Sequence, residues 1–152
     1  MSKKPTIEER QNALLSMREQ HHRTCPVCGD LNPNGLHAVF EVRPDGAVEA
    51  GVICGKAKEG YDGYLHGGII ASLLDGAMTN CLFSHGIRAV TGELVVRMVQ
   101  PLRAGTKVVV CAWLERRLPP LYLMKAELRQ GGRLAAKGRA KFMQKPPGRV
   151  PL

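Results

Sequence analysis

His66, Gly67, Gly68 and Asp75 are the residues of this chain whose types and spacing could do chemistry. His66-Gly67-Gly68 opens the most hydrophobic segment, which reads as a helix. The first N–H groups of a helix have no intrahelical partner and lie at the positive end of its dipole. Glycines there let a ligand approach the bare backbone, so this start could bind an anion or a developing oxyanion. The alternative is a Gly-Gly pair that simply lets a loop turn.

Asp75 is the only charged residue between His66 and Arg88, and its neighbours in the sequence are apolar. Burying a carboxylate is costly unless it is paired or hydrogen-bonded, and burial tends to raise its pKa. This pattern indicates a general base or a nucleophile in a dry pocket. The structural alternative is a carboxylate that caps a neighbouring loop or holds a subunit contact.

Spacing limits how Gly67 and Asp75 can cooperate. They are eight positions apart, which is about 12 Å along a helix axis. A reacting carbonyl lies ~3 Å from both its attacking group and its oxyanion donor. If the two groups act together, they must therefore come from two copies of the chain related by a two-fold axis. Thr79 lies one turn past Asp75 on the same face, where its hydroxyl could hold a water.

The elements that must position these groups follow from periodicity and turn residues. Thr6 and Glu9 form a capping box that begins a helix ending near residue 20. Alternating residues predict strands, and apolar residues on every face predict a buried helix. The expected elements are strands at 36–42, 48–54, 89–100, 106–116, 121–129 and 133–143, and the buried helix at 67–83. This order predicts an α+β fold in which an antiparallel sheet of about six strands curls round one long buried helix.

Length and composition bound the class of protein. The chain has 152 residues, enough for one domain. We divide it into an N-terminal helix and cysteine-containing loop (1–35), a core (36–143) and a loose tail (144–152). No apolar run reaches the ~18 residues of a membrane span, and the N-terminus does not read as a signal peptide. Five cysteines, an odd number, fit a reducing cytoplasm rather than a disulfide scaffold.

The net charge of +9 attracts polyanions. Nucleic acid, membrane phosphates and a phosphate-bearing ligand such as coenzyme A all fit this charge, and so does a soluble surface that is merely basic. Only 5% of the residues are aromatic, which argues against a base-stacking platform. We expect neither nucleic acid nor a membrane as partner.

The stretch 64–75, Tyr-Leu-His-Gly-Gly-Ile-Ile-Ala-Ser-Leu-Leu-Asp, resembles the helix signature of hotdog-fold acyl-CoA thioesterases of the phenylacetyl-CoA thioesterase-like group. In that pattern an acid follows the His of H-G-G by nine residues. The stretch 91–97, with Pro101 and Gly105, is similar to the family's central strand and its exit turn. The resemblance covers about residues 25–143 and agrees with the order of elements. It implies a hotdog fold and hydrolysis of an acyl-CoA to free acid and coenzyme A, with no cofactor in catalysis.

The resemblance also implies roles for single residues. Asp75 would activate water or attack the thioester carbonyl, and the Gly67 N–H of the facing subunit would polarise that carbonyl. His66 would shape the site, and Thr79 would position water or the acid. The substrate-binding residues would include Gly68 and Thr91, with the coenzyme A phosphates along basic strand ends at Arg103 and Arg117. The family's assembly implies a homodimer and, by pairing of dimers, a homotetramer. The acyl group is left open.

Two other functions remain open on this fold. A hydroxyacyl dehydratase needs a catalytic His in a D-x-N-P-x-H-type stretch, and residues 63–66 lack that pattern. A non-catalytic acyl-CoA sensor would regulate through an attached DNA-binding domain. The ~20 residues before the cysteine block are too few for the two or three helices of such a domain.

The pair Cys25 and Cys28 forms a knuckle-like C-x-x-C. A zinc site has four ligands, so the pair supplies half of one, which His21 and His22 could complete. The alternatives are a packed turn, which we favour, and a redox pair, which lacks the βαβ context of such motifs. The block 25–36 also resembles a loop found before the first strand in some hotdog thioesterases.

Overall fold

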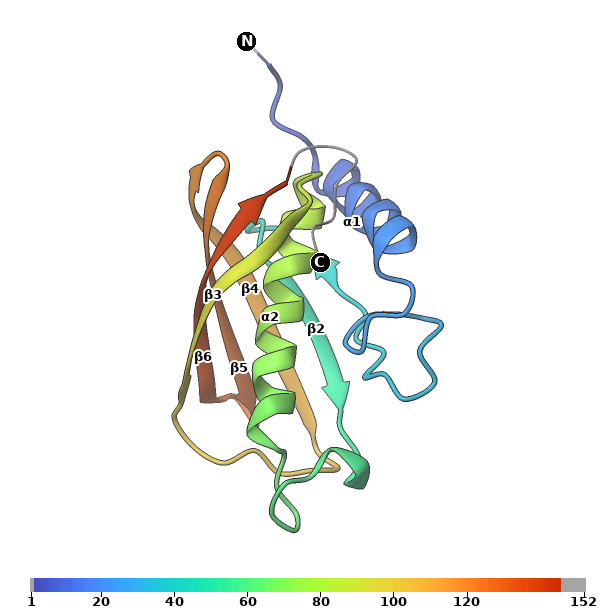
Figure 1. Ribbon diagram of the computed structural model, residues 1–152, viewed down its shortest axis with the longest axis vertical. Coiled ribbons are helices and arrows are strands. Elements are labelled where there is room, and N and C mark those ends of the chain that lie inside the picture. Colours follow the sequence, from blue (N-terminus) through green and yellow to red (C-terminus); the bar gives the residue numbers. More distant parts are fainter. Residues whose placement is uncertain (1, 146–152) are drawn as a thin grey trace.

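The long helix α2, Gly67–Ser84, lies against one face of a six-stranded antiparallel sheet (Figure 1). This computed structural model describes residues 2–145. A second helix, α1 (Ile7–His21), packs beside α2, and a short 3-10 helix, η1 (Lys56–Lys58), precedes α2. The strands are β1 (Glu41–Val42), β2 (Val48–Ile53), β3 (Ala89–Met98), β4 (Lys107–Leu118), β5 (Leu121–Gln130) and β6 (Arg133–Gln144). Their order in the sheet is β1-β2-β4-β5-β6-β3, which confirms the expected curved sheet around one long helix.

The core lies between α2 and the inner face of the sheet. Leu73, Leu74, Ala77 and Met78 of α2 are fully buried there. A Cβ at Gly138 of β6 would lie 3.5 Å from Leu74, an ordinary contact distance, so the helix packs directly on the middle of the sheet. The hydrophobic contact of this one helix with five strands holds the fold together.

The two halves of α2 differ in exposure. Twelve of its residues are buried, and all but three of them belong to the run Gly76–Ser84. The N-terminal half instead carries a face that is open or half-open to solvent, formed by Gly68, Ser72 and Asp75. The helix expected to be apolar all round is therefore buried all round only in its second half.

Strand β3 is an edge of the sheet, bonded to β6 on one side and to no other strand of the described chain. It carries unusually exposed apolar side chains, including Val90, Val95 and Met98. An edge strand with unpaired N–H and C=O groups and apolar side chains is a template for pairing with another chain.

The first helix follows its capping signal. Thr6 Oγ1 accepts a hydrogen bond from Glu9 N, and Glu9 Oε2 accepts one from Thr6 N at 2.6 Å. Arg10 is buried and donates to Ser84 at the end of α2. This anchor between the two helices was not predicted from the sequence.

The strand expected at 36–42 is the main correction to the predicted elements, because only Glu41 and Val42 pair with β2. The alternating burial is as expected, with Ala38 and Phe40 buried and Val39 exposed. The backbone, however, bonds elsewhere: Leu36 N donates to Pro26 O and Ala38 N to Val27 O. The segment therefore closes the cysteine loop instead of extending the sheet.

The remaining boundaries match the expectation within two residues at nearly every end. Gly86, with a φ of 68°, follows the end of α2 as expected. The tail was expected to be loose over residues 144–152, but Gln144 is the last residue of β6, and residues 146–152 lie outside the described residues. No helix in the described part of the chain combines the length and the hydropathy needed to cross a bilayer.

Candidate active site

Asp75 and Thr91 form the centre of the candidate site. Asp75 is half-buried on the open face of α2, and Thr91 Oγ1 on the edge strand β3 donates a hydrogen bond to Asp75 Oδ1 at 2.7 Å. The second carboxylate oxygen has no hydrogen bond from the described residues. One oxygen is thus fixed by the protein, and the other is left for a ligand or water.

Burial raises the pKa of the Asp75 carboxyl, because it penalises the charged form. The hydrogen bond from Thr91 acts in the opposite direction and lowers this pKa, and the weaker charges of Cys25 (raising) and His22 (lowering) follow. A carboxylate whose pKa lies above its usual range is a better proton acceptor, as a general base requires.

The start of α2 is capped by His66. Its Nδ1 accepts a hydrogen bond from Gly68 N at 2.8 Å. A Cβ at Gly68 would lie 3.0 Å from the same nitrogen, so glycine leaves room for the imidazole. His66 and Gly68 therefore form the N-terminal cap of α2 together.

Gly67 is left as the exposed first residue of the helix. Its N–H makes no hydrogen bond with the described residues. A Cβ added there would meet only Met98 Cε of β3, at 3.6 Å. The free donor that the sequence predicts is thus open to a ligand beside the exposed edge of the sheet.

Thr79 lies next to Asp75 but binds its backbone. Thr79 Oγ1 donates to the Asp75 carbonyl oxygen at 3.0 Å, not to the carboxylate. The hydroxyl proton is therefore committed to the helix, and the oxygen lone pairs remain for a water.

The two arginines proposed for coenzyme A phosphates lie at opposite ends of the molecule. Arg103 stacks over the Tyr64 ring, with 5.8 Å from its guanidinium carbon to the ring centroid. Arg117 lies near His85 at the other end of α2, where burial first, and Arg10 and Arg117 next, lower the pKa of His85 to about 4. One chain therefore does not bring Arg103 and Arg117 to a common phosphate.

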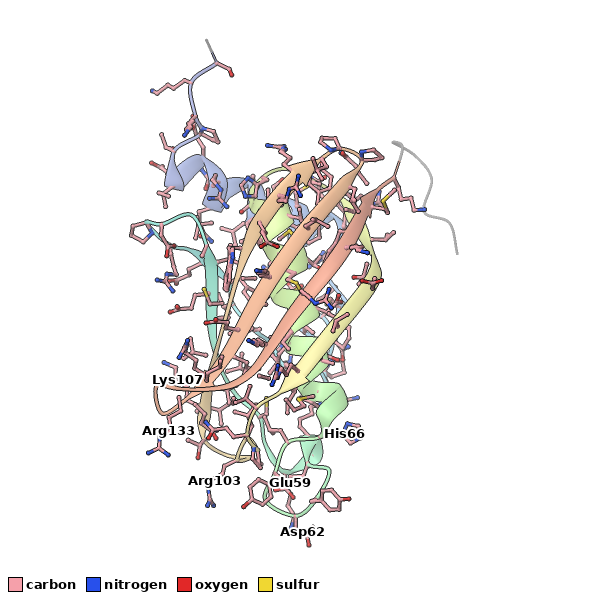
Figure 2. All side chains as sticks on the ribbon, turned by 90° about the vertical axis from the view of Figure 1, so that its left-hand side faces the viewer. Glu59, Asp62, His66, Arg103, Lys107 and Arg133 are labelled. Carbon is pink, nitrogen blue, oxygen red and sulfur yellow. The ribbon has the colours of Figure 1, made fainter. Side chains whose placement is uncertain are left out.

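A basic end surrounds the start of α2. Figure 2 shows Arg103, Lys107 and Arg133 at the same end of the molecule as His66, with Glu59 and Asp62 on the neighbouring loop. A shallow groove of ≈300 Å³ there is lined by Tyr64, Gln100, Pro101, Arg103, Gln130 and Arg133. Two hydrogen bonds join Gln130 to the backbone of Arg103 in this groove: Gln130 Oε1 accepts one from Arg103 N, and Gln130 Nε2 donates one to Arg103 O.

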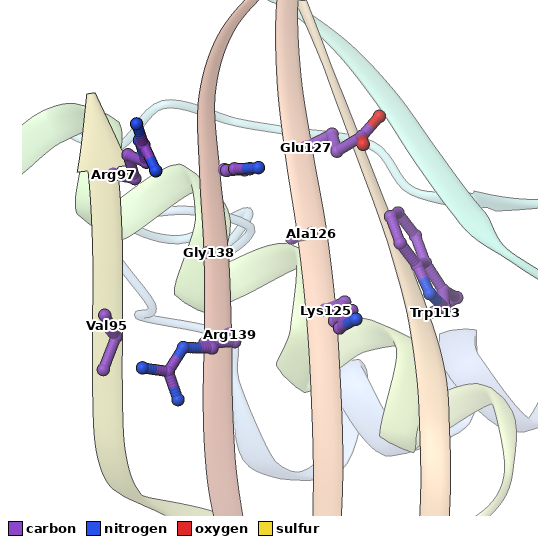
Figure 3. A pocket seen from close by; sticks show the side chains of 9 residues that line it. Val95, Arg97, Trp113, Lys125, Ala126, Glu127, Gly138 and Arg139 are labelled. Carbon is purple, nitrogen blue, oxygen red and sulfur yellow. The ribbon is translucent and has the colours of Figure 1, made fainter. Parts of the chain in front are cut away.

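A second concave region lies on the outer face of the sheet, away from α2 (Figure 3). It has a volume of ≈500 Å³, and Trp113, Arg97, Lys125 and Arg139 are among its lining residues. The sheet separates it from the face of α2 that carries Asp75, so it has no part in that site.

The comparisons with known proteins agree with this fold. A family model described as the thioesterase superfamily matches residues 62–119, the stretch from the loop before α2 through the end of β4. Over this stretch the chain is similar to the thioesterase superfamily, and its fold is the hotdog fold. The resemblance inferred from the H-G-G helix is confirmed. No curated protein sequence matches the chain at a significant level.

Three solved structures illustrate the likeness. The PaaI protein from the phenylacetic acid degradation operon of E. coli is 16% identical, with a TM-score of 0.78 over 93% of this chain and 97% of that one. A putative thioesterase related to phenylacetic acid degradation, from Ralstonia eutropha, is 26% identical, with a TM-score of 0.65 over 71% and 85%. A hypothetical thioesterase from Streptococcus pneumoniae, solved with coenzyme A, is 17% identical, with a TM-score of 0.67 over 71% and 85%.

Sequence reasoning missed part of this hotdog site. Thr91 was placed among substrate-binding residues, whereas its hydroxyl holds Asp75. The effect of the His22 and Cys25 charges on the pKa of Asp75 was also missed. The sequence did contain a signal that another segment packs next to Asp75. Gly76 follows Asp75 directly, and a glycine inside a buried helix indicates close packing; here Val27 packs against it.

Proposed function

We propose that this protein hydrolyses acyl-CoA thioesters at a site formed between two copies of the chain. The observation that carries the proposal is the half-buried Asp75, fixed at one oxygen by Thr91 and open at the other. The thioesterase-superfamily segment and the hotdog fold support the reaction class. The coenzyme A bound to a structural neighbour supports the ligand class.

The chemistry assigned to Asp75 is activation of water. The carboxylate takes a proton from a water molecule, whose oxygen attacks the thioester carbonyl carbon. The tetrahedral oxyanion is stabilised by the Gly67 N–H of the facing copy. The C–S bond then breaks, and the coenzyme A thiolate leaves and takes up the proton from Asp75. Direct attack by the Asp75 carboxylate, followed by hydrolysis of the anhydride, is the alternative route to the same products. Neither route consumes anything but water, so the proposed reaction needs no cofactor.

Two copies are needed because Gly67 and Asp75 are separated by about 12 Å along α2. The exposed apolar edge of β3 supports the contact, since Val90, Val95 and Met98 lie on the same strand as Thr91. Pairing of this edge with its own copy is antiparallel and two-fold, so it generates two equivalent sites. Association of two such dimers into a tetramer remains a prediction.

The ligand would enter at the basic end of the molecule. Arg103, Lys107 and Arg133 lie near the start of α2 (Figure 2), and cations there suit the phosphates of coenzyme A. None of the five cysteines, all within the described residues, forms a disulfide, which is compatible with the reducing cytoplasm that we propose as the location of the reaction.

A thiol-release assay tests the function. A panel of short, medium, long and aryl acyl-CoAs is mixed with a thiol-reactive dye, with the wild-type protein and Asp75→Asn side by side. We expect turnover in the wild type that is lost in the variant. Saturable acyl-CoA binding without turnover in the wild type would instead favour a binding protein, and neither turnover nor binding would contradict the proposal.

A further inference from the structure

The loop between α1 and residue 36 brings three metal-ligating side chains together. His22, Cys25 and Cys28 each offer one ligand atom, and these atoms lie within 4.8 Å of one another. His22 Nδ1 is 3.8 Å from Cys28 Sγ. His21, the neighbour that the sequence offered equally, is not part of the cluster.

These distances fit a tetrahedral metal. With Zn–S and Zn–N bonds of about 2.3 and 2.1 Å, ligand atoms of a tetrahedral site lie about 3.4–3.8 Å apart. The cluster needs to contract by about 1 Å at most to reach this spacing. Two thiolates and one imidazole are a soft to borderline donor set, which selects zinc over magnesium or calcium.

The turn that carries the cysteines is built tightly. Val27 N donates to Cys25 Sγ at 3.4 Å, an N–H···S bond of the kind that stabilises a thiolate ligand. Gly29 N donates to Cys25 O at 2.9 Å, and a Cβ at Gly29 would lie 2.4 Å from Cys25 N. The turn thus requires glycine directly after Cys28 and holds both sulfurs on one side.

The helix α2 forms the floor of the cluster. Asn80 is fully buried, its amide lies within hydrogen-bonding reach of Cys28, and its Nδ2 donates to Gly76 O. Asn80 Oδ1 is a buried side-chain oxygen without a hydrogen-bond partner among the described residues. The helix thus closes the cluster on its buried side, and a further ligand can reach it from the half-exposed side of His22 and Cys25.

We propose that His22, Cys25 and Cys28 bind a zinc ion, whose fourth position is taken by water on the half-exposed side of the cluster. The ring of His22 is already oriented by an edge-on contact with Phe83, at 4.9 Å between centroids. The ion would join the end of α1 to the loop that packs on Gly76, the residue after Asp75. It holds the wall of the candidate site in place and takes no part in the hydrolysis.

The test measures metal content and does not depend on activity. The full chain is purified with reductant, equilibrated with zinc chloride, desalted and analysed by mass spectrometry for zinc. We expect about one zinc per chain in the wild type and in Cys111→Ser, a control whose half-buried thiol lies outside the cluster. Cys25→Ser and His22→Gln should lose at least nine-tenths of it. Cobalt should give the thiolate charge-transfer absorption of a tetrahedral site in the wild type and in Cys111→Ser, and not in Cys25→Ser or His22→Gln.

A second measurement uses the wild type alone, so it stands even if the variants fold poorly. Zinc should protect the half-exposed thiol of Cys25 from alkylation in the native protein, and a chelator should restore its reactivity. A wild type that retains no zinc would overturn the proposal. So would equal alkylation with and without the metal, or a Cys25–Cys28 disulfide that persists in reductant and excludes zinc.

Discussion

Thr91 on β3 and Asp75 on α2 are joined by one hydrogen bond of 2.7 Å, between side chains 16 residues apart in the sequence. This bond connects the open face of the helix to the exposed edge of the sheet. It also ties the candidate base to the strand through which we propose that two copies pair.

Asp75→Asn should abolish hydrolysis, with kcat lowered by about 10²-fold or more, while the fold is retained. The folded state binds the Asp75 proton more tightly than the unfolded state, because burial raises the pKa. The stability linked to this group is thus present at low pH and is lost as pH rises through the folded pKa. At neutral pH the variant should therefore be at least as stable as the wild type. Thermal melts beside the thiol-release assay check both statements, and full activity in the variant would remove Asp75 from the mechanism.

Thr91→Val should move the acidic limb of the pH–rate profile to higher pH. The hydroxyl bond lowers the pKa of Asp75, so without it the carboxyl protonates sooner as pH falls. The measurement is kcat/KM against pH, with Thr106→Val as a matched control on an exposed loop. An unchanged acidic limb in Thr91→Val would mean that Asp75 does not set it.

His66→Ala should cost about 1 kcal/mol of stability, because the side-chain cap on Gly68 N is lost. His66→Asn restores a good capping side chain and should recover this stability. Denaturant titration measures the difference. If His66→Asn also restores activity, the contribution of His66 is the cap alone; if stability returns and activity does not, His66 has a further role in the site.

Gly76→Ala should destabilise the protein by about 1–3 kcal/mol through overpacking. Its Cβ would lie 2.5 Å from Val27 Cγ1, and this clash outweighs the helix propensity gained from alanine. Val27→Ala in the same chain should relieve part of the loss. Gly138→Ala is the control, since its Cβ would make ordinary contacts at 3.5 Å. Equal stability of Gly76→Ala and the wild type would show that the cysteine loop is loosely packed.

Much of the fold could be predicted because its signals are local. The capping box at Thr6 and the alternation of β6 each lie within a few residues of sequence. Residues 36–40 show the limit, since their alternation is that of a strand but their backbone partners are Pro26 and Val27. Periodicity shows which side chains are buried, but it does not show with which segment the backbone forms its hydrogen bonds.

The residues of the candidate site could likewise be predicted only in part. Asp75 could be identified from the sequence because it is the only charged residue in an apolar helix. Gly67 could be identified because it lies at the first position of that helix and has no side chain. The bond from Thr91 and the choice of His22 over His21 depend on contacts between distant segments. Arg103 and Arg117 flank the strand expected at 106–116, so the sequence already separates them, but it does not show which of the two lies at the end where α2 begins.

In the proposed mechanism, the Gly67 N–H of one copy and the Asp75 carboxylate of the other act on the same thioester carbonyl. Gly67→Pro removes the proposed donor at small cost, because proline is tolerated at the first position of a helix and His66, with ψ of 139°, already has the backbone that precedes proline. Gly67→Pro and Asp75→Asn should each be inactive. In a hybrid dimer of the two variants, one site keeps both groups and the other has neither.

The decisive measurement is therefore thiol release by an equal mixture of the two inactive variants, unfolded together and refolded. Random pairing makes about half of the dimers hybrids with one good site of two, so about one quarter of wild-type activity should return. The same mixture combined without exchange of subunits is the control. Activity that stays at the level of the separate variants, with hybrid dimers demonstrated by mass spectrometry, would contradict a site shared between two copies.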